Sequence, residues 1–117
     1  MKAIEFGFRG ADTFHNGELV RFENGGFLVH MADAFGVKNV QDAKKVAALL
    51  LAGKNRQAQK LGTPAFISFA GPTSPGTVQQ SMIHATPGVY VLACFMDTQD
   101  GREHTALGME RIIRVTK

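Results

Sequence analysis

The run Val-Tyr-Val-Leu-Ala-Cys-Phe, residues 89–95, is the strongest strand signal in the chain. It is apolar at every position, which predicts a central strand covered on both faces. Pro87-Gly88 before the run and Asp100-Gly101 after it are turn signals. The run therefore predicts the middle of a sheet, and the only cysteine of the chain, Cys94, lies near its end.

Further segments of strand length lie on both sides of this run. In the first of them Ile4, Phe6 and Phe8 alternate with Glu5 and Gly7, the period of two that is typical of a half-buried strand. Strands are expected at residues 2–8, 18–24, 27–35, 64–70, 77–85, 89–95 and 111–116. About seven short strands separated by Gly and Pro turns predict an all-β protein, either a β-sandwich or a small barrel.

Residues 39–61 differ from the rest of the chain and predict a helical insertion. Asn39 is a suitable N-cap, Gly53 is a suitable C-cap, and apolar residues between them recur at helical spacing. A second short helical segment is expected from 54 to 61. The apolar stripe favours a helix that plugs one end of the sandwich, and the alternative is a flap over a site or a surface for a partner.

Four side chains together have the chemistry of a copper site. Cys94, His104 and Met109 follow one another on the C-terminal part of the chain, and His30 lies in an apolar strand far upstream. A thiolate, two imidazoles and a weak axial thioether are the ligands of blue-copper sites. The arrangement makes these four residues candidate metal ligands, and His84 is a substitute for His104.

Each of these residues also has an ordinary structural interpretation. A lone cysteine in a central strand is commonly a small buried hydrophobic residue, and a methionine is commonly core filler. His30 in a strand can be a buried histidine with one hydrogen bond, and His104 after a turn can be solvated.

Composition limits the other classes of function. The chain has 117 residues and a formal charge of +3, values that suit one domain over 1–117. Its basic residues are scattered, which disfavours nucleic-acid binding, and no apolar run is long enough to span a membrane. One cysteine excludes an intrachain disulfide. No signature of a conventional enzyme is present, and the first residues predict a strand instead of a signal peptide.

Three segments resemble the cupredoxin family, the plastocyanin- and azurin-like proteins. They are Asn24-Gly25-Gly26-Phe27-Leu28-Val29-His30, Pro87-Gly88-Val89-Tyr90-Val91-Leu92-Ala93-Cys94-Phe95, and His104 to Met109. The Pro-Gly-X-Tyr-X-X-X-Cys run is the most specific of them. The chain is similar as well to bacterial cupredoxin-like domains that carry a Cys-Phe, Asp-Gly, His and Gly-Met pattern.

The resemblance implies a fold and a function. It implies a Greek-key β-sandwich and a copper ion held by His30, Cys94, His104 and Met109, with Cys94 as thiolate and Met109 axial. It also implies a one-electron carrier that works with a redox partner protein, not an enzyme, in a periplasmic or other extracytoplasmic compartment.

One departure from the family pattern decides whether such a site can form. Nine residues, 95–103, lie between Cys94 and His104, whereas blue-copper loops have two to four there. The Asp100-Gly101 turn could fold these residues into a hairpin finger that leaves Cys94 and His104 adjacent at its base. The alternatives to an electron carrier are a copper-free cupredoxin-like module that binds a protein, and a protein for copper storage or delivery.

Overall fold

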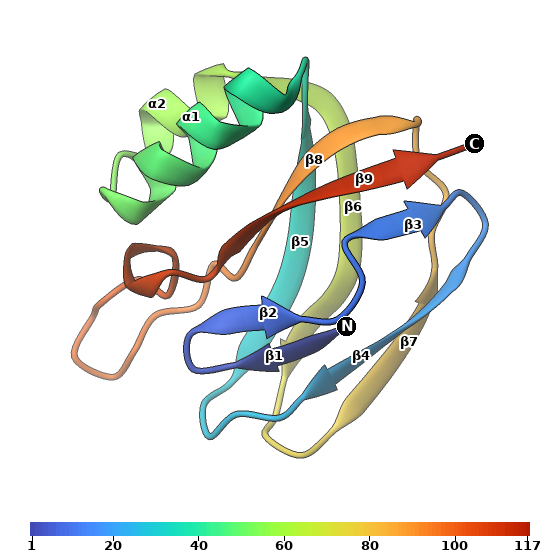
Figure 1. The fold of residues 1–117 in the computed structure, drawn as a ribbon. Coiled ribbons are helices and arrows are strands. Elements are labelled where there is room, and N and C mark those ends of the chain that lie inside the picture. Colours follow the sequence, from blue (N-terminus) through green and yellow to red (C-terminus); the bar gives the residue numbers. More distant parts are fainter.

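A computed structural model, which describes residues 1–117, shows two sheets packed face to face (Figure 1). One sheet has the strand order β2-β1-β4-β7, with bounds Gly7–Arg9, Lys2–Ile4, Leu19–Asn24 and Val78–Met82. The other has the order β3-β9-β8-β5-β6, with bounds Thr13–His15, Glu110–Thr116, Gly88–Ala93, His30–Val37 and Gly62–Thr73. The β-sandwich expected from the sequence is confirmed.

Strand β8 is the central strand of the larger sheet, as its apolar sequence predicts. It pairs antiparallel with β5 on one side and with β9 on the other. Tyr90 and Leu92 are buried toward the smaller sheet, while Val91 and Ala93 are buried toward the helices. Both faces are covered, so every side chain from Tyr90 to Ala93 is out of water.

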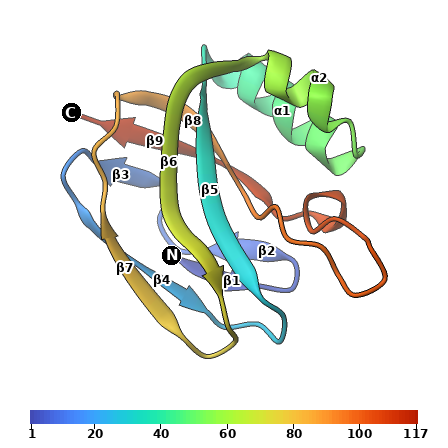
Figure 2. The ribbon, with the colours of Figure 1, turned by 180° about the vertical axis from the view of Figure 1, so that it is seen from behind.

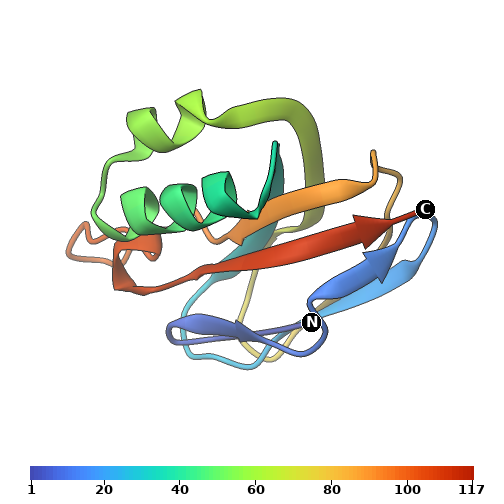
Figure 3. The same ribbon diagram turned by 45° about the horizontal axis from the view of Figure 1, so that its top comes forward.

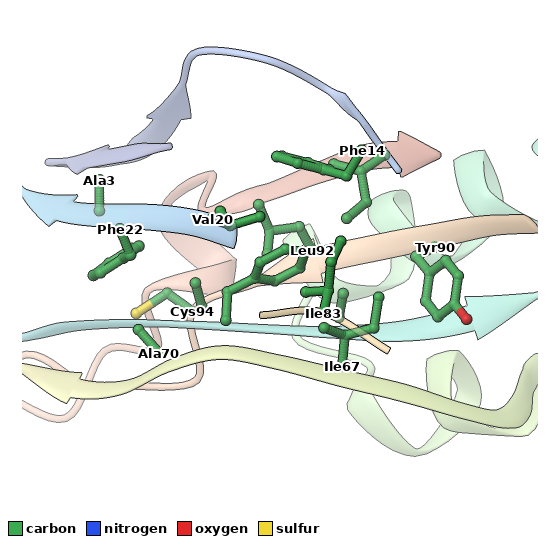
Figure 4. Packing of buried hydrophobic residues seen from close by; sticks show 14 of the residues in the cluster. Ala3, Phe14, Val20, Phe22, Ile67, Ala70, Ile83, Tyr90, Leu92 and Cys94 are labelled. Atoms are coloured by element: carbon green, nitrogen blue, oxygen red, sulfur yellow. The ribbon is translucent and has the colours of Figure 1, made fainter. Parts of the chain in front are cut away.

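The core between the two sheets continues to Cys94. Figure 4 shows the Cys94 side chain in the same packed layer as Phe22 and Ala70, with its sulfur toward one end of the sandwich. Each large buried side chain of this layer contributes about 1.5–3 kcal/mol of hydrophobic stabilisation. The end of β8 therefore places the cysteine in a rigid setting.

The helical insertion covers the outer face of the larger sheet (Figure 3). It consists of α1, Val40–Leu51, and α2, Asn55–Lys60. The Asn39 side chain accepts a hydrogen bond from the backbone N–H of Asp42 and caps α1. Ala43, Val46 and Leu50 bury the apolar stripe of α1, so the helices cover a face of the sandwich instead of plugging an end. Neither helix has the length and apolar character required to cross a membrane.

The first strand differs from its prediction. Residues 2–8 were expected to be one strand, but β1 and β2 form an antiparallel hairpin whose tip is Glu5-Phe6. Alternation gives the period of a strand and does not show where the chain reverses. No strand was expected between residues 8 and 18, but the short strand β3 lies there and pairs parallel with β9.

Glu110, at the start of β9, is half-buried and has one carboxyl oxygen out of reach of water and of any hydrogen-bond donor. It lies opposite Ala93 in the ladder between β8 and β9, on the side of the sheet that the helices cover. Its Oε2 atom is buried and accepts no hydrogen bond. Burial raises the pKa of the Glu110 carboxyl from its usual 4.5 to about 7.

The Glu110→Gln variant is expected to be more stable than the native chain above neutral pH. Because the folded-state pKa of Glu110 is the higher one, the contribution of this carboxyl to the free energy of unfolding is most favourable below about pH 4.5 and becomes unfavourable as the pH rises through 7. The substitution should raise that free energy by about 1–3 kcal/mol at pH 8 and have little effect at pH 4.5. Urea unfolding of the metal-free protein at both pH values measures this, and an equal effect at both would contradict it.

Candidate metal centre

Three buried side chains converge at one end of the sandwich. His30, Cys94 and His104 each present a ligand atom, and these atoms all lie within 4.8 Å of one another. The Nδ1 atom of His30 lies 3.9 Å from the Cys94 sulfur, and that of His104 lies 3.4 Å from it. Both imidazoles therefore turn the same ring nitrogen toward one sulfur.

Neighbouring strands bring the first two of these residues together. His30 opens β5, and Cys94 directly follows the end of β8, which pairs with β5. The backbone N–H of Met31 donates a hydrogen bond of 3.3 Å to the Cys94 sulfur. The ladder thus fixes a residue 64 positions upstream beside the cysteine.

The nine residues between Cys94 and His104 form a hairpin finger, one of the two outcomes that the sequence allowed. Asp97 and Glu103 pair as an antiparallel bridge, and the backbone N–H of Thr98 bonds to the Arg102 oxygen at 2.8 Å. At the base, the N–H of His104 bonds to the Met96 oxygen at 2.9 Å. The finger projects away from the sandwich (Figure 1), so its length does not separate Cys94 from His104.

Backbone hydrogen bonds join Met109 to Cys94 and to His104. Its carbonyl oxygen accepts from the N–H of Cys94 at 3.2 Å, and its N–H donates to the His104 oxygen at 3.1 Å. The 3-10 turn η1, Thr105–Leu107, leads from His104 to it, and Gly108 adopts φ +108°, where a side chain is strained. The side chain of Met109 is fully buried in the core.

Glu5, at the tip of the β1–β2 hairpin, contacts the ring nitrogen of His30 that faces away from Cys94. Its carboxylate contacts the Nε2 atom of His30 and accepts a hydrogen bond from the N–H of Phe27. Gly26 leaves no room for a side chain beside that carboxylate. Burial opposes ionisation of Glu5, but hydrogen bonds from His30 and from the Phe27 N–H lower its pKa, so the carboxylate is charged.

Phe6, also at the hairpin tip, covers both imidazoles. Its ring centroid lies 5.1 Å from that of His104 and 6.4 Å from that of His30. The Nε2 atom of His104 is buried and has no hydrogen-bond partner. Since His104 is only 1% exposed, the site is closed at the point where the sequence had suggested a solvated histidine.

The protonation states suit a metal site. Burial, followed by the charge of His30, lowers the pKa of the His104 imidazole, which keeps it neutral and free to coordinate. Burial raises the pKa of the Cys94 thiol, against the hydrogen bonds from the Met31 and Met96 N–H groups. The metal-free protein therefore holds a thiol that must lose its proton when a metal binds.

The two separations between the Cys94 sulfur and the imidazole nitrogens are close to those expected around a metal ion. A metal bonded at roughly 2.0 Å to nitrogen and 2.3 Å to sulfur in tetrahedral or trigonal geometry holds those atoms roughly 3.6–3.8 Å apart. The two observed separations from the sulfur, 3.4 and 3.9 Å, lie on either side of that range. The donor set of two imidazoles and one thiolate matches what copper favours.

The arrangement of the sheets and the positions of the three converging residues follow one pattern. Two sheets form a sandwich, and an early histidine meets a Cys-His pair from the connection between the last two strands. The fold is cupredoxin-like. As in the cupredoxin pattern, the cysteine follows a central strand and the second histidine comes from the connection after it.

Comparisons with known proteins find similar solved structures of low sequence identity. No family model and no curated protein matches. Dithionite-reduced auracyanin from Roseiflexus castenholzii is similar at 17% identity, with a TM-score of 0.48 over 99% of this chain and 95% of that one. Auracyanin A from Chloroflexus aurantiacus, described as a blue copper protein, is similar at 16% identity, with a TM-score of 0.48 over 99% of this chain and 97% of that one. The azurin Az-iso2 from Methylomonas sp. strain J is similar at 12% identity, with a TM-score of 0.49 over 99% of this chain and 95% of that one.

Glu5 and Phe6 were not predicted as site residues, and His84 is not part of the cluster. Glu5 and Phe6 gave no signal, because the alternation of residues 2–8 placed Glu5 on a solvated face. His84, considered as a substitute ligand, is exposed and lies outside the cluster, and so does His15.

Proposed function

We propose that this chain is a type I copper protein that carries one electron between partner proteins. The observation that carries the proposal is the convergence of two Nδ1 atoms on one buried sulfur. His30, Cys94, His104 and Met109 are the residues that would hold the copper ion. Bound copper would supply a one-electron couple at this place.

The residues around the ligands suit repeated electron transfer. Backbone hydrogen bonds tie Cys94 to Met109 and His104 to Met96, and the ligands lie in or beside the packed core. A site fixed in this way keeps its ligand positions when the charge at its centre changes. The Met31 N–H bond to the sulfur is one of the contacts by which such a protein sets its potential.

Further parts of the proposal follow from the cupredoxin resemblance. We infer that residues 1–117 form one cupredoxin-like domain, that it carries electrons instead of catalysing a reaction, and that it works in a periplasmic or other extracytoplasmic compartment. The second candidate function is a copper-free module that binds a protein. The pairing of His30 with Glu5 favours this alternative, since it satisfies that histidine without a metal.

Titration of the reduced, metal-free protein with Cu(II) tests the proposal. We expect an intense thiolate-to-copper absorption band that saturates at one equivalent, together with the electron paramagnetic resonance signal of a copper thiolate. The His15→Ala/His84→Ala double variant is the control and should give the same titration, because both histidines are exposed and remote from the cluster. Copper bound without a band, or lost in the control variant, would contradict the proposal.

A further inference from the structure

The surface beside Cys94 that remains open is formed by two phenylalanines. Phe95 directly follows Cys94 and is 41% exposed, and Phe66 of β6 is 58% exposed. Both line one pocket of about 300 Å³ together with Leu50, Asn55 and Gln59 of the helical insertion. We call Phe66, Phe95 and this pocket the Phe66–Phe95 patch.

The helical insertion gives this patch a strongly basic surrounding. Residues 38–60 hold six lysines and arginines against one aspartate, a net charge of +5, while the rest of the chain holds seven against nine, a net −2. The insertion thus carries the whole positive excess of the protein. All six basic residues are exposed: Lys38, Lys44, Lys45, Lys54, Arg56 and Lys60.

The insertion also contacts the segment that holds the site. The Asn55 side chain donates a hydrogen bond of 2.9 Å to the Glu103 carboxylate, one residue before His104. Figures 1 and 2 both show the end of the insertion beside the finger and η1. The route past His104, by contrast, is covered by Phe6.

From these observations we propose that the Phe66–Phe95 patch and the basic insertion form the docking surface for an acidic redox protein. Its use in electron transfer rests on the proposed function; the surface itself does not. An apolar centre with a polar rim is typical of protein interfaces, and opposite charge speeds the encounter of two proteins. One electron lost by the site is gained by the redox centre of the partner, and no bond or proton changes.

Other classes of anionic partner fit this surface less well. The apolar stripe of α1 is buried against the sheet, so it is not free to enter a membrane surface. Residues 38–60 contain no aromatic side chain, and of the three phenylalanines that line the pocket only Phe66 and Phe95 are exposed enough to stack on a base. Phe95 of the patch directly follows Cys94 in the chain, so a protein docked there lies close to the site. This position favours a redox protein as the partner.

Decaglutamate is a suitable acidic probe for the ¹⁵N-labelled, metal-free protein at low ionic strength. Backbone shifts should concentrate in residues 38–62 and around Phe66 and Phe95, and should fade as salt is added. In Lys54→Glu/Lys60→Glu the affinity should fall by at least about tenfold. The matched control is Arg114→Glu/Lys117→Glu, which makes the same charge change on exposed residues at the far end of β9 and should lose less than about threefold.

A second peptide tests the apolar centre. A decaglutamate with two central leucines should bind the native chain more tightly than decaglutamate, and Phe95→Ser should remove that gain. Equal losses in the two charge variants would overturn the proposal, and so would tighter binding of an oligothymidylate or of phosphatidylglycerol vesicles at this surface. Because no copper is present, a failed copper titration leaves this result standing and would favour the interaction module.

Discussion

The Cys94→Ala variant is expected to lose the intense visible band and to bind copper at least about 100-fold more weakly than the native chain. Residues that only support a metal ligand change affinity by about 10- to 100-fold, and Cys94 is the residue on which both imidazoles converge. Isothermal titration in the presence of a competing chelator measures the affinity, and absorption measures the band.

The stability of the metal-free variant separates a lost ligand from a lost fold. Cys94 is fully buried, so Cys94→Ala removes one sulfur from the core and should lower the free energy of unfolding by about 1–2 kcal/mol. Cys94→Ser should be less stable than Cys94→Ala, because a hydroxyl replaces the sulfur in an apolar layer. A folded Cys94→Ala protein that keeps native copper affinity would show that the sulfur is core packing.

Removing the Glu5 carboxylate is expected to weaken copper binding by about 10- to 100-fold in Glu5→Ala. The carboxylate contacts Nε2 of His30, which leaves Nδ1 to face the Cys94 sulfur. A carboxylate on the far nitrogen fixes the orientation of a ligand histidine and raises its basicity, which favours the more highly charged metal ion. The reduction potential should therefore rise in Glu5→Ala, and voltammetry measures it.

A readout without copper tests the same role of Glu5. In the metal-free protein, the ¹⁵N shifts of the His30 ring should change in Glu5→Ala, because the tautomer is no longer set by the carboxylate. Glu18→Ala is the control, since Glu18 lies outside the cluster and accepts only from the His15 backbone. Unchanged His30 shifts and an unchanged potential would show that Glu5 serves the hairpin alone.

The layout of the sandwich could be predicted because its strands carry their signals locally. Residues 89–95 are apolar on both faces, and the structure covers both faces of β8. In the strand expected at residues 18–24, Val20 and Phe22 alternate with polar residues, and both are buried. The helix from Asn39 onward followed from its cap and its apolar stripe. Its place on a face of the sheet did not follow, since a stripe does not identify the surface that it contacts.

The surroundings of the candidate site could not be predicted, because they depend on contacts between distant segments. A hairpin finger at residues 95–103 was one of two outcomes that the Asp100-Gly101 turn allowed, and backbone hydrogen bonds decided between them. Glu5 and Phe6 reach the histidines only because the chain reverses after Ile4. The burial of His104 follows from that reversal and not from any local pattern.

The most direct test of the account is X-ray absorption at the copper edge of the protein loaded with one equivalent of Cu(II). If His30, Cys94 and His104 hold the ion, the fine structure contains one short sulfur distance and the scattering pattern of two imidazoles. A first shell of nitrogen and oxygen alone would contradict the account, because it would place copper away from the Cys94 sulfur.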